Sequence, residues 1–110
     1  ENVGMMPEEF FLYYEELDWC EQIRRAGYSI WYEPAANILH RESVSTGKAS
    51  PMKTEYLTRN RILFMRRNFK GWRWAAFISF FTIVSLPIGT FRWCLAGDFA
   101  QIKALWRGFF

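Results

Sequence analysis

Three carboxylates lie close together near the start of the chain, where Glu15, Glu16 and Asp18 directly follow the aromatic run FFLYY. Neighbouring carboxylates repel one another, and this repulsion favours taking up a proton, as a general base does from a substrate hydroxyl. Acids in the first turn of a helix also stabilise its positive end. The residue types therefore predict one wall of an active site, a helix start, or both at once.

A second polar group begins at His40, the only histidine of the sequence. The segment RESVSTGK, residues 41–48, supplies hydroxyl donors and two cations, which are groups that bind phosphate oxygens. A solvated surface loop has the same composition, so both interpretations stay open. Cys20 and Cys94 are far apart and show no CxxC or Cys/His spacing, which argues against a zinc site and fits a reducing compartment.

The elements that carry these residues are predicted from periodicity and from helix-start and helix-stop patterns. FFLYY, residues 10–14, is short and aromatic, as strands are. A helix is predicted over 16–26, because acids fill its first turn and two arginines its last, and Gly27 is placed to end it. Residues 28–34 and 36–40 are predicted as two further short strands, followed by the polar loop.

The second half of the sequence is helical and apolar in pattern. A helix is predicted over 52–68 and an amphipathic helix over the tail, 97–110. Between them, residues 74–91 carry no formal charge. As a helix this segment would measure roughly 27 Å, just short of a bilayer core of about 30 Å.

Three arrangements of the uncharged segment are open: a single membrane span, a buried helix of a soluble protein, or an interfacial or re-entrant helical hairpin bent near Pro87. Residues 59–73 hold six Lys or Arg and no acid, and cations also follow the segment. Cations prefer the cytoplasmic side, so the hairpin, which keeps both flanks on one side, is favoured. The cations that follow are Arg92, Lys103 and Arg107.

The bulk composition narrows the class of protein. With 110 residues, 51% of them hydrophobic and 20% aromatic, the sequence is not that of a disordered tail. The net charge of +3 is modest, but its clustering suits anionic lipids or phosphate-bearing ligands more than nucleic acid. The sequence begins without Met or a signal peptide, and we expect it to be cut from a longer protein.

The stretch FFLYYEELDWCEQIRRAGYSIWYEPAANILHRESVSTGK resembles the C-terminal part of the catalytic domain of family 2 glycosyltransferases, in particular the bacterial rhamnosyltransferase-like members. The shared pattern is an aromatic strand, Glu-Asp-x-Asp, a helix ending in Arg-(Arg/Lys)-Ala-Gly-Tyr, a strand, a proline, a strand and a histidine. YLTRNRILFMRRNF resembles the helix that follows. The resemblance implies an α/β chain: the C-terminal portion of a GT-A fold over residues 1–70, the acceptor-side part, and a membrane-associating helical tail over 71–110.

The resemblance also implies a chemistry, inverting transfer of a sugar from a nucleotide sugar to a glycan or lipid-linked acceptor. The second residue of the Glu-Asp pair is the usual base, and here that position holds Glu16, one methylene longer than Asp. The base is therefore open between Glu16 and Asp18, with Glu15 as a third candidate, and we favour Glu16. His40 is implied to ligate Mg²⁺ or Mn²⁺ or to bond a phosphate oxygen. The implied diphosphate-binding residues after it are Arg41, Ser43, Ser45, Thr46 and Lys48.

Partners follow from the same resemblance. The family carries the nucleotide on an N-terminal βαβ half with an Asp-x-Asp metal motif, and the sequence holds neither, so we expect it to need that missing half and to be inactive alone. Its expected place is the cytoplasmic face of the cell membrane, in cell-surface polysaccharide synthesis, with no nucleic acid partner. Two alternatives stay open: a non-catalytic membrane- or nucleic-acid-binding module, and a degenerate copy that only binds sugar.

Overall fold

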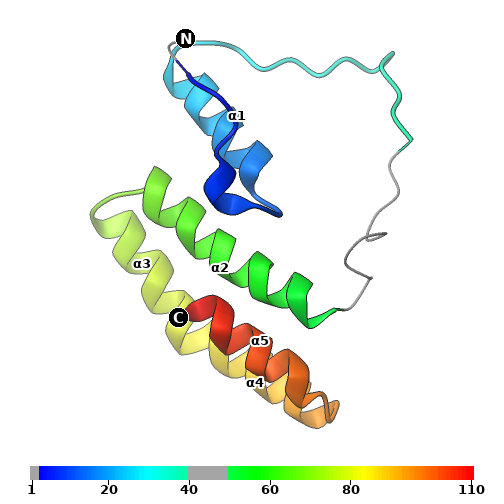
Figure 1. Ribbon diagram of the computed structural model, residues 1–110. Coiled ribbons are helices and arrows are strands. Elements are labelled where there is room, and N and C mark those ends of the chain that lie inside the picture. The colour runs from blue at the N-terminus through cyan, green and yellow to red at the C-terminus, as the bar shows by residue number, and fades with distance from the viewer. Residues whose placement is uncertain (1–2, 40–49) are drawn as a thin grey trace.

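The computed structural model describes residues 3–39 and 50–110, and across these ranges the chain is helical without any strand. The α/β fold that the resemblance implied is therefore wrong for this chain as described. Figure 1 shows a group of packed helices and a long irregular segment that leaves them after α1. The elements are η1 (Glu8–Phe10), α1 (Glu15–Arg25), α2 (Pro51–Asn68), α3 (Trp72–Phe80), η2 (Phe81–Ser85), α4 (Leu86–Leu95) and α5 (Phe99–Phe109).

The three predicted strands fail for a shared reason. A strand satisfies its backbone groups only beside another strand, and no described segment offers one. Phe10 instead ends the short helix η1, residues 11–14 form the tight turn before α1, and residues 28–34 are irregular chain with Trp31 87% exposed. The third predicted strand, 36–40, is irregular as far as residue 39, and His40 lies outside the described residues. The aromatic composition of these segments predicted strands, but no neighbouring strand is present among the described residues to pair with them.

The helices predicted before and after the polar loop are confirmed as α1 and α2. Acids fill the first turn of α1, and Gly27 follows its end with a φ of 92°, a left-handed value that glycine adopts without strain. At the start of α2 the Ser50 hydroxyl accepts a hydrogen bond from the backbone N–H of Lys53, and Pro51 occupies the first helical position.

The uncharged segment lies in one continuous helix, Trp72–Leu95, formed by α3, the π-helical turn η2 and α4. By length and composition this helix can cross a membrane. The chain does not reverse at Pro87, because the π-helical turn directly before it accommodates the missing N–H and the proline ring. The reversal comes after the helix, at Gly97, and the predicted tail helix follows as α5, capped by the Asp98 carboxylate.

The long helix folds against its neighbours through a small apolar core. Helix α5 runs back between α4 and α2, so that α2, α5 and the long helix lie side by side (Figure 1). Phe81, Leu86 and Leu105 form the buried centre of this core. The rings of Phe81 and Phe109 stack at 6.3 Å between centroids. Ile62 packs against the same cluster and so attaches α2 to the helical hairpin that Trp72–Leu95 and α5 form.

Gly108 permits the closest contact between α2 and α5. A Cβ atom at this position would lie 2.8 Å from the Cβ of Thr58 and would also clash with the carbonyl oxygen of Glu55. Both obstacles belong to a neighbouring helix, and one is backbone, so neither can rotate away. The crossing of α2 and α5 therefore depends on the absence of a side chain at this residue.

We expect Gly108→Ala to destabilise the fold by about 2 kcal/mol, because the added methyl overpacks the α2–α5 contact. Gly89→Ala is the matched control, since its Cβ would meet only a side-chain methyl of Leu105 at 3.1 Å. The measurement is urea unfolding in detergent, followed by helical circular dichroism. Equal stability of the two variants would contradict the close crossing.

Candidate active site

The turn that precedes the acids is held by one side chain of α2. Asn60 is fully buried, and its Nδ2 donates to the carbonyl oxygens of Phe10, at 2.6 Å, and Tyr13, at 3.1 Å, and also to that of Leu12. Within this turn Tyr13 and Phe11 have φ values of 67° and 58°, in the left-handed region that aromatic residues rarely adopt. The amide of Asn60 thus fixes the backbone that leads into α1.

Asp18 is engaged on both carboxylate oxygens and is 0% exposed. It accepts hydrogen bonds from Asn68 Nδ2 and Gln22 Nε2, both at 2.6 Å, and from Arg67 Nε at 3.3 Å. Arg67 also donates from Nη1 to Glu9, at 2.5 Å. This carboxylate therefore fastens α1 to the end of α2, and it is not accessible to a substrate.

The other two acids of the first turn have different surroundings. The Glu16 side chain is exposed to solvent. Glu15 is half-buried, and its Oε2 is buried without a hydrogen-bond partner among the described residues. A buried carboxylate oxygen without a donor is costly, so a donor from outside the described chain would stabilise it. The structure thus gives different surroundings to the three acids, among which the sequence favoured Glu16.

The last turn of α1 carries a surface ion pair. Arg24 Nη2 lies 2.7 Å from Glu21 Oε1, and Arg25 is also within reach of that carboxylate. The hydrogen bond from Arg24, with the charges of both arginines, holds the pKa of Glu21 below its usual range. These contacts stabilise the end of α1 away from the acids of the first turn.

The predicted phosphate and metal residues cannot be placed beside the acids. They lie outside the described residues: His40, Arg41, Ser43, Ser45, Thr46 and Lys48. Across the described ranges, no three His, Cys, Asp or Glu side chains gather in a way that could hold a metal ion. The acids of α1 are among the residues to which this applies. His40 lies outside the described residues, so its predicted role as a metal ligand stays a prediction.

Asn60, Arg67 and Asn68 were not singled out from the sequence as part of this site. Their spacing carried a usable pattern, because Asn60 and Asn68 lie two turns apart and therefore on one face of a predicted helix. Asparagine is disfavoured in helix interiors, since its amide competes for backbone groups. Two such residues on one face, beside a basic residue, indicate a polar contact with another segment.

Two curated relatives are similar to this chain. It is 28% identical over 99 residues, 90% of its length, to the N-acetylglucosaminyl-diphospho-decaprenol L-rhamnosyltransferase of Mycobacterium tuberculosis. It is 33% identical over 64 residues, 57% of its length, to the low-salt glycan biosynthesis hexosyltransferase Agl10 of Haloferax volcanii. The matches cover 28% and 21% of those proteins, so the chain spans about a quarter of their length.

No protein-family model matches the chain, and no solved structure matches it. The two relatives nevertheless share one class of activity in their names, the transfer of a sugar. The chain is therefore a distant homologue of glycosyltransferases over a small portion of their length, which agrees in part with the resemblance drawn from its motifs.

We expect Asn60→Ala to destabilise α1 and the preceding turn by about 2 kcal/mol, because three carbonyl oxygens lose their donor. Asn37→Ala is the control, since Asn37 is exposed in irregular chain. Hydrogen exchange of the α1 amides reports the change. Unchanged protection of α1 in Asn60→Ala would show that the turn holds without this amide.

Asp18→Asn and Glu16→Gln make the same acid-to-amide change in opposite surroundings. We expect Asp18→Asn to cost about 2 kcal/mol of stability, because the ion pair with Arg67 is lost and amide donors then face one another. Arg67 is 32% exposed, so the cost is below that of a fully buried pair. Glu16→Gln should change stability by less than about 0.5 kcal/mol. Chemical unfolding of both variants measures this, and equal losses would refute the distinction.

Proposed function

We propose that this chain is the acceptor-side part of a longer inverting glycosyltransferase. That enzyme would move a sugar from a nucleotide-sugar donor to a glycan or lipid-linked acceptor, in cell-surface polysaccharide synthesis. The homology to a rhamnosyltransferase and a hexosyltransferase supports sugar transfer. One observation carries the residue assignment: Glu16 is exposed at the start of α1, whereas Asp18 is buried and fully bonded.

In the proposed reaction the Glu16 carboxylate takes the proton from the acceptor hydroxyl, while that oxygen forms a bond to the anomeric carbon of the donor. The bond from this carbon to the diphosphate oxygen breaks, and the nucleoside diphosphate leaves with the electron pair. Attack from the opposite face inverts the anomeric configuration.

The donor side of the reaction belongs to other residues in this proposal. A divalent ion, Mg²⁺ or Mn²⁺, would accompany the donor diphosphate on an N-terminal nucleotide-binding half, since the described residues do not fit a metal site. The segment from His40 to Lys48, which lies outside the described residues, keeps its predicted role in binding the diphosphate. The acids of α1 then act on the acceptor alone.

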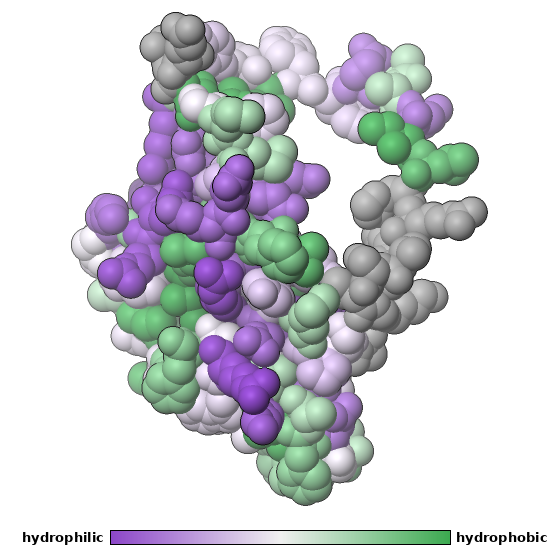
Figure 2. Space-filling model, viewed as in Figure 1, coloured by the Kyte–Doolittle hydropathy of each residue, from purple (hydrophilic) through white to green (hydrophobic). Residues whose placement is uncertain are grey.

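Membrane attachment is the second part of the proposal, and the exposure of Trp72–Leu95 supports it. Only 11% of its most apolar stretch is buried, whereas the core helix of a soluble protein is mostly buried. In Figure 2 hydrophilic residues gather over α1 and the neighbouring part of α2, while white to green residues prevail at the far end of α4 and α5. The large apolar side chains exposed on the long helix are Trp72, Phe80, Ile83, Ile88, Phe91 and Leu95.

The packing of α2 favours an interfacial position over a single span. Helix α2 lies beside α3 and α5, along the length of the hairpin (Figure 1), and it carries four arginines. A transmembrane orientation of the long helix would draw these charges towards hydrocarbon, which is costly. With the long helix in the plane of the cytoplasmic membrane face, α2 and α1 lie on the water side.

The decisive test compares the longer protein that contains this chain with its Glu16→Gln variant. A panel of nucleotide sugars is supplied with Mg²⁺ or Mn²⁺ and a lipid-linked acceptor, and donor consumption is measured. We expect one donor to be consumed and the variant to be slower by about 100-fold or more, because the base is lost.

Glu33→Gln is the matched control, since Glu33 is exposed and distant in sequence from the acids. Circular dichroism of both variants verifies the fold. An active Glu16→Gln variant would make this assignment wrong and leave Glu15 as the candidate base, or Asp18 if the site opens to expose it. If no donor is consumed, the alternative is a non-catalytic module; nucleic-acid binding would then show as oligonucleotide affinity that falls steeply with salt.

A further inference from the structure

The exposed side chains along one face of Trp72–Leu95 follow a regular spacing that breaks once. Each comes three or four residues after the one before it, as residues on one face of an α-helix do. The one longer step is the five residues from Ile83 to Ile88, both of which are exposed. This row, the apolar stripe, consists of Trp72, Ala76, Phe80, Ile83, Ile88, Phe91 and Leu95.

The longer step coincides with the π-helical turn η2. The hydrogen bonds of a π-helix join residues five apart, so this turn takes in one residue more than an α-helical turn. The buried side of the helix shows the same step, because Phe81 and Leu86 are five residues apart and both lie in the core. The π-helical turn therefore keeps α3 and α4 in one orientation, in which their buried sides share a core and their exposed sides form one continuous stripe.

The same turn places two arginines on one flank of the apolar stripe. Arg73 and Arg92 are both exposed, and each directly follows a residue of the stripe, Trp72 or Phe91. One residue along an α-helix corresponds to about 100° around it, so both arginines flank the stripe on the same side. They lie 19 positions apart (92 − 73), which is roughly 28 Å along the helix.

Both guanidinium groups lie against tryptophan rings and carry unpaired charge. Arg73 is 5.8 Å from the ring centroid of Trp72, and Arg92 is 5.2 Å from that of Trp93. Neither arginine takes part in an ion pair among the described residues. Tryptophan prefers the head-group level of a membrane, and arginine lays its stem along apolar surface while its charge reaches the water.

A common flank has a meaning only for a helix that lies in the plane of the surface. In that orientation both guanidinium groups face the same layer of lipid phosphates, whereas the two ends of a spanning helix meet different layers. Arginine presents paired donors that match phosphate oxygens. The positions of Arg73 and Arg92 therefore fit two head groups of one lipid layer, with the apolar stripe below them.

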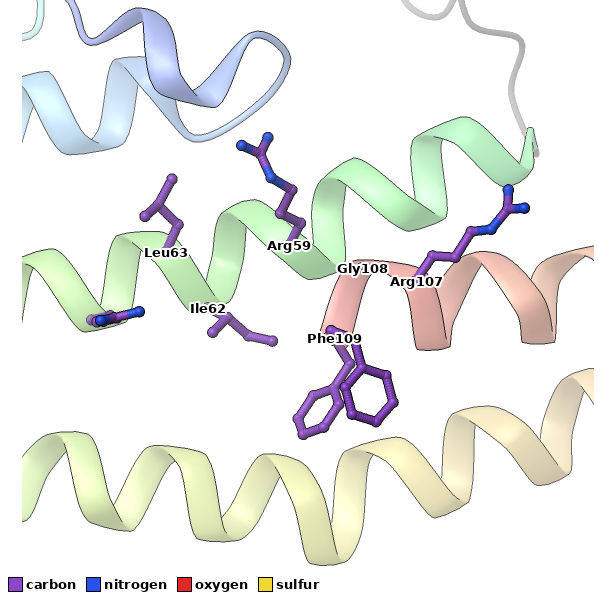
Figure 3. Close-up of a pocket in the computed structure, with 8 residues that line it drawn as sticks. Arg59, Ile62, Leu63, Arg107, Gly108 and Phe109 are labelled. Atoms are coloured by element: carbon purple, nitrogen blue, oxygen red, sulfur yellow. The ribbon is translucent and has the colours of Figure 1, made fainter.

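Other cations of the helical group lie on its water side. In the close-up of the pocket between α2 and α5 (Figure 3), Arg59 and Arg107 extend away from the long helix, whereas Phe109 extends towards it. The thickness of the long helix, about 10 Å, separates these two arginines from the apolar stripe. This exceeds the screening length of about 8 Å at physiological salt, so they should add little to attraction by a lipid surface.

We propose that the apolar stripe docks onto an anionic lipid surface, with Arg73 and Arg92 on the phosphates of two head groups. Charge complementarity selects the lipid class, because residues 69–110 hold five cations and a single acid, Asp98, whose carboxylate caps α5. The inference rests on the membrane attachment in the proposed function. It adds the class of lipid, the anchoring residues and the role of the π-helical turn.

The first test is a vesicle-binding assay with the longer protein. One set of vesicles is phosphatidylcholine alone, and the other also contains phosphatidylglycerol. We expect tighter binding to the second set, and about tenfold weaker binding to it by Arg73→Gln/Arg92→Gln, because each cation near an anionic surface strengthens binding severalfold. The matched control, Arg59→Gln/Arg107→Gln, removes the same charge on the water side and should stay within about twofold.

Three results would overturn the inference. They are equal affinity for the two sets of vesicles, equal losses in the two double variants, and a loss in Arg73→Lys/Arg92→Lys as large as that in the glutamine variant. The lysine variant keeps both charges, so it should retain most of the preference for phosphatidylglycerol.

The role of η2 is tested by the depth of side chains in the membrane. Nitroxide labels are attached one at a time at Ile83→Cys and Ile88→Cys, in a cysteine-free background on phosphatidylglycerol vesicles. We expect equal depth at these two positions and a shallower label at Thr82→Cys, which lies about 100° around the helix from Ile83. A steady change of depth from Ala76→Cys to Leu95→Cys would show a spanning helix and refute docking in the surface plane.

Binding requires no turnover, so these tests are separate from that of sugar transfer. Glu16→Gln should bind phosphatidylglycerol vesicles as the unmodified protein does, and such binding without any transfer would leave the docking surface standing while sugar transfer fails. Equal, tight binding to both sets of vesicles would keep membrane attachment and refute the anionic-lipid inference alone.

Discussion

Polar bonds from one face of α2 hold the N-terminal segment and α1, and the position of every acid depends on them. Asn60 holds the turn, while Arg67 and Asn68 hold Asp18. Aromatic contacts add to these bonds: Phe10 is buried beneath the Arg67 guanidinium, and the rings of Phe11 and Tyr14 lie against those of Tyr56 and Phe64 of α2. Charge-assisted bonds in a buried setting are strong when complete and costly when one member is missing. The attachment of α1 is therefore specific, and it is sensitive to single substitutions.

This attachment explains how an unusual backbone persists in front of the acids. A left-handed conformation costs of order 1–3 kcal/mol for a residue with a side chain, and the turn contains three such residues, all aromatic. Tyr14, the last of them, precedes α1 without a side-chain cap, so the acids of the first turn alone offset the helix dipole. The two interpretations of the acids are thus compatible: Asp18 fixes the helix, and Glu16 stays accessible.

Local patterns predicted the helices well, because their causes are local. Acids, arginines and Gly27 mark the bounds of α1, and Ser50 with Pro51 marks the start of α2. The strands were wrong, since a strand depends on a neighbour that its own composition cannot specify. The polar network was missed for the same reason: Asn60 lies about 50 residues from the carbonyl groups it binds.

The reversal of the hairpin shows a different limit of sequence reasoning. Pro87 is a helix breaker by type, yet the π-helical turn before it lets the helix continue to Leu95. A continuous helix offers a long apolar face, and α5 returns along this helix to reach α2. Helix α2 then contacts the apolar hairpin on one side and the acid-bearing segment on the other.

In the proposed arrangement this single rigid helix sets the height of Glu16 above the membrane surface. Substitutions that loosen α1 from α2 should therefore impair transfer without detaching the apolar hairpin from the membrane.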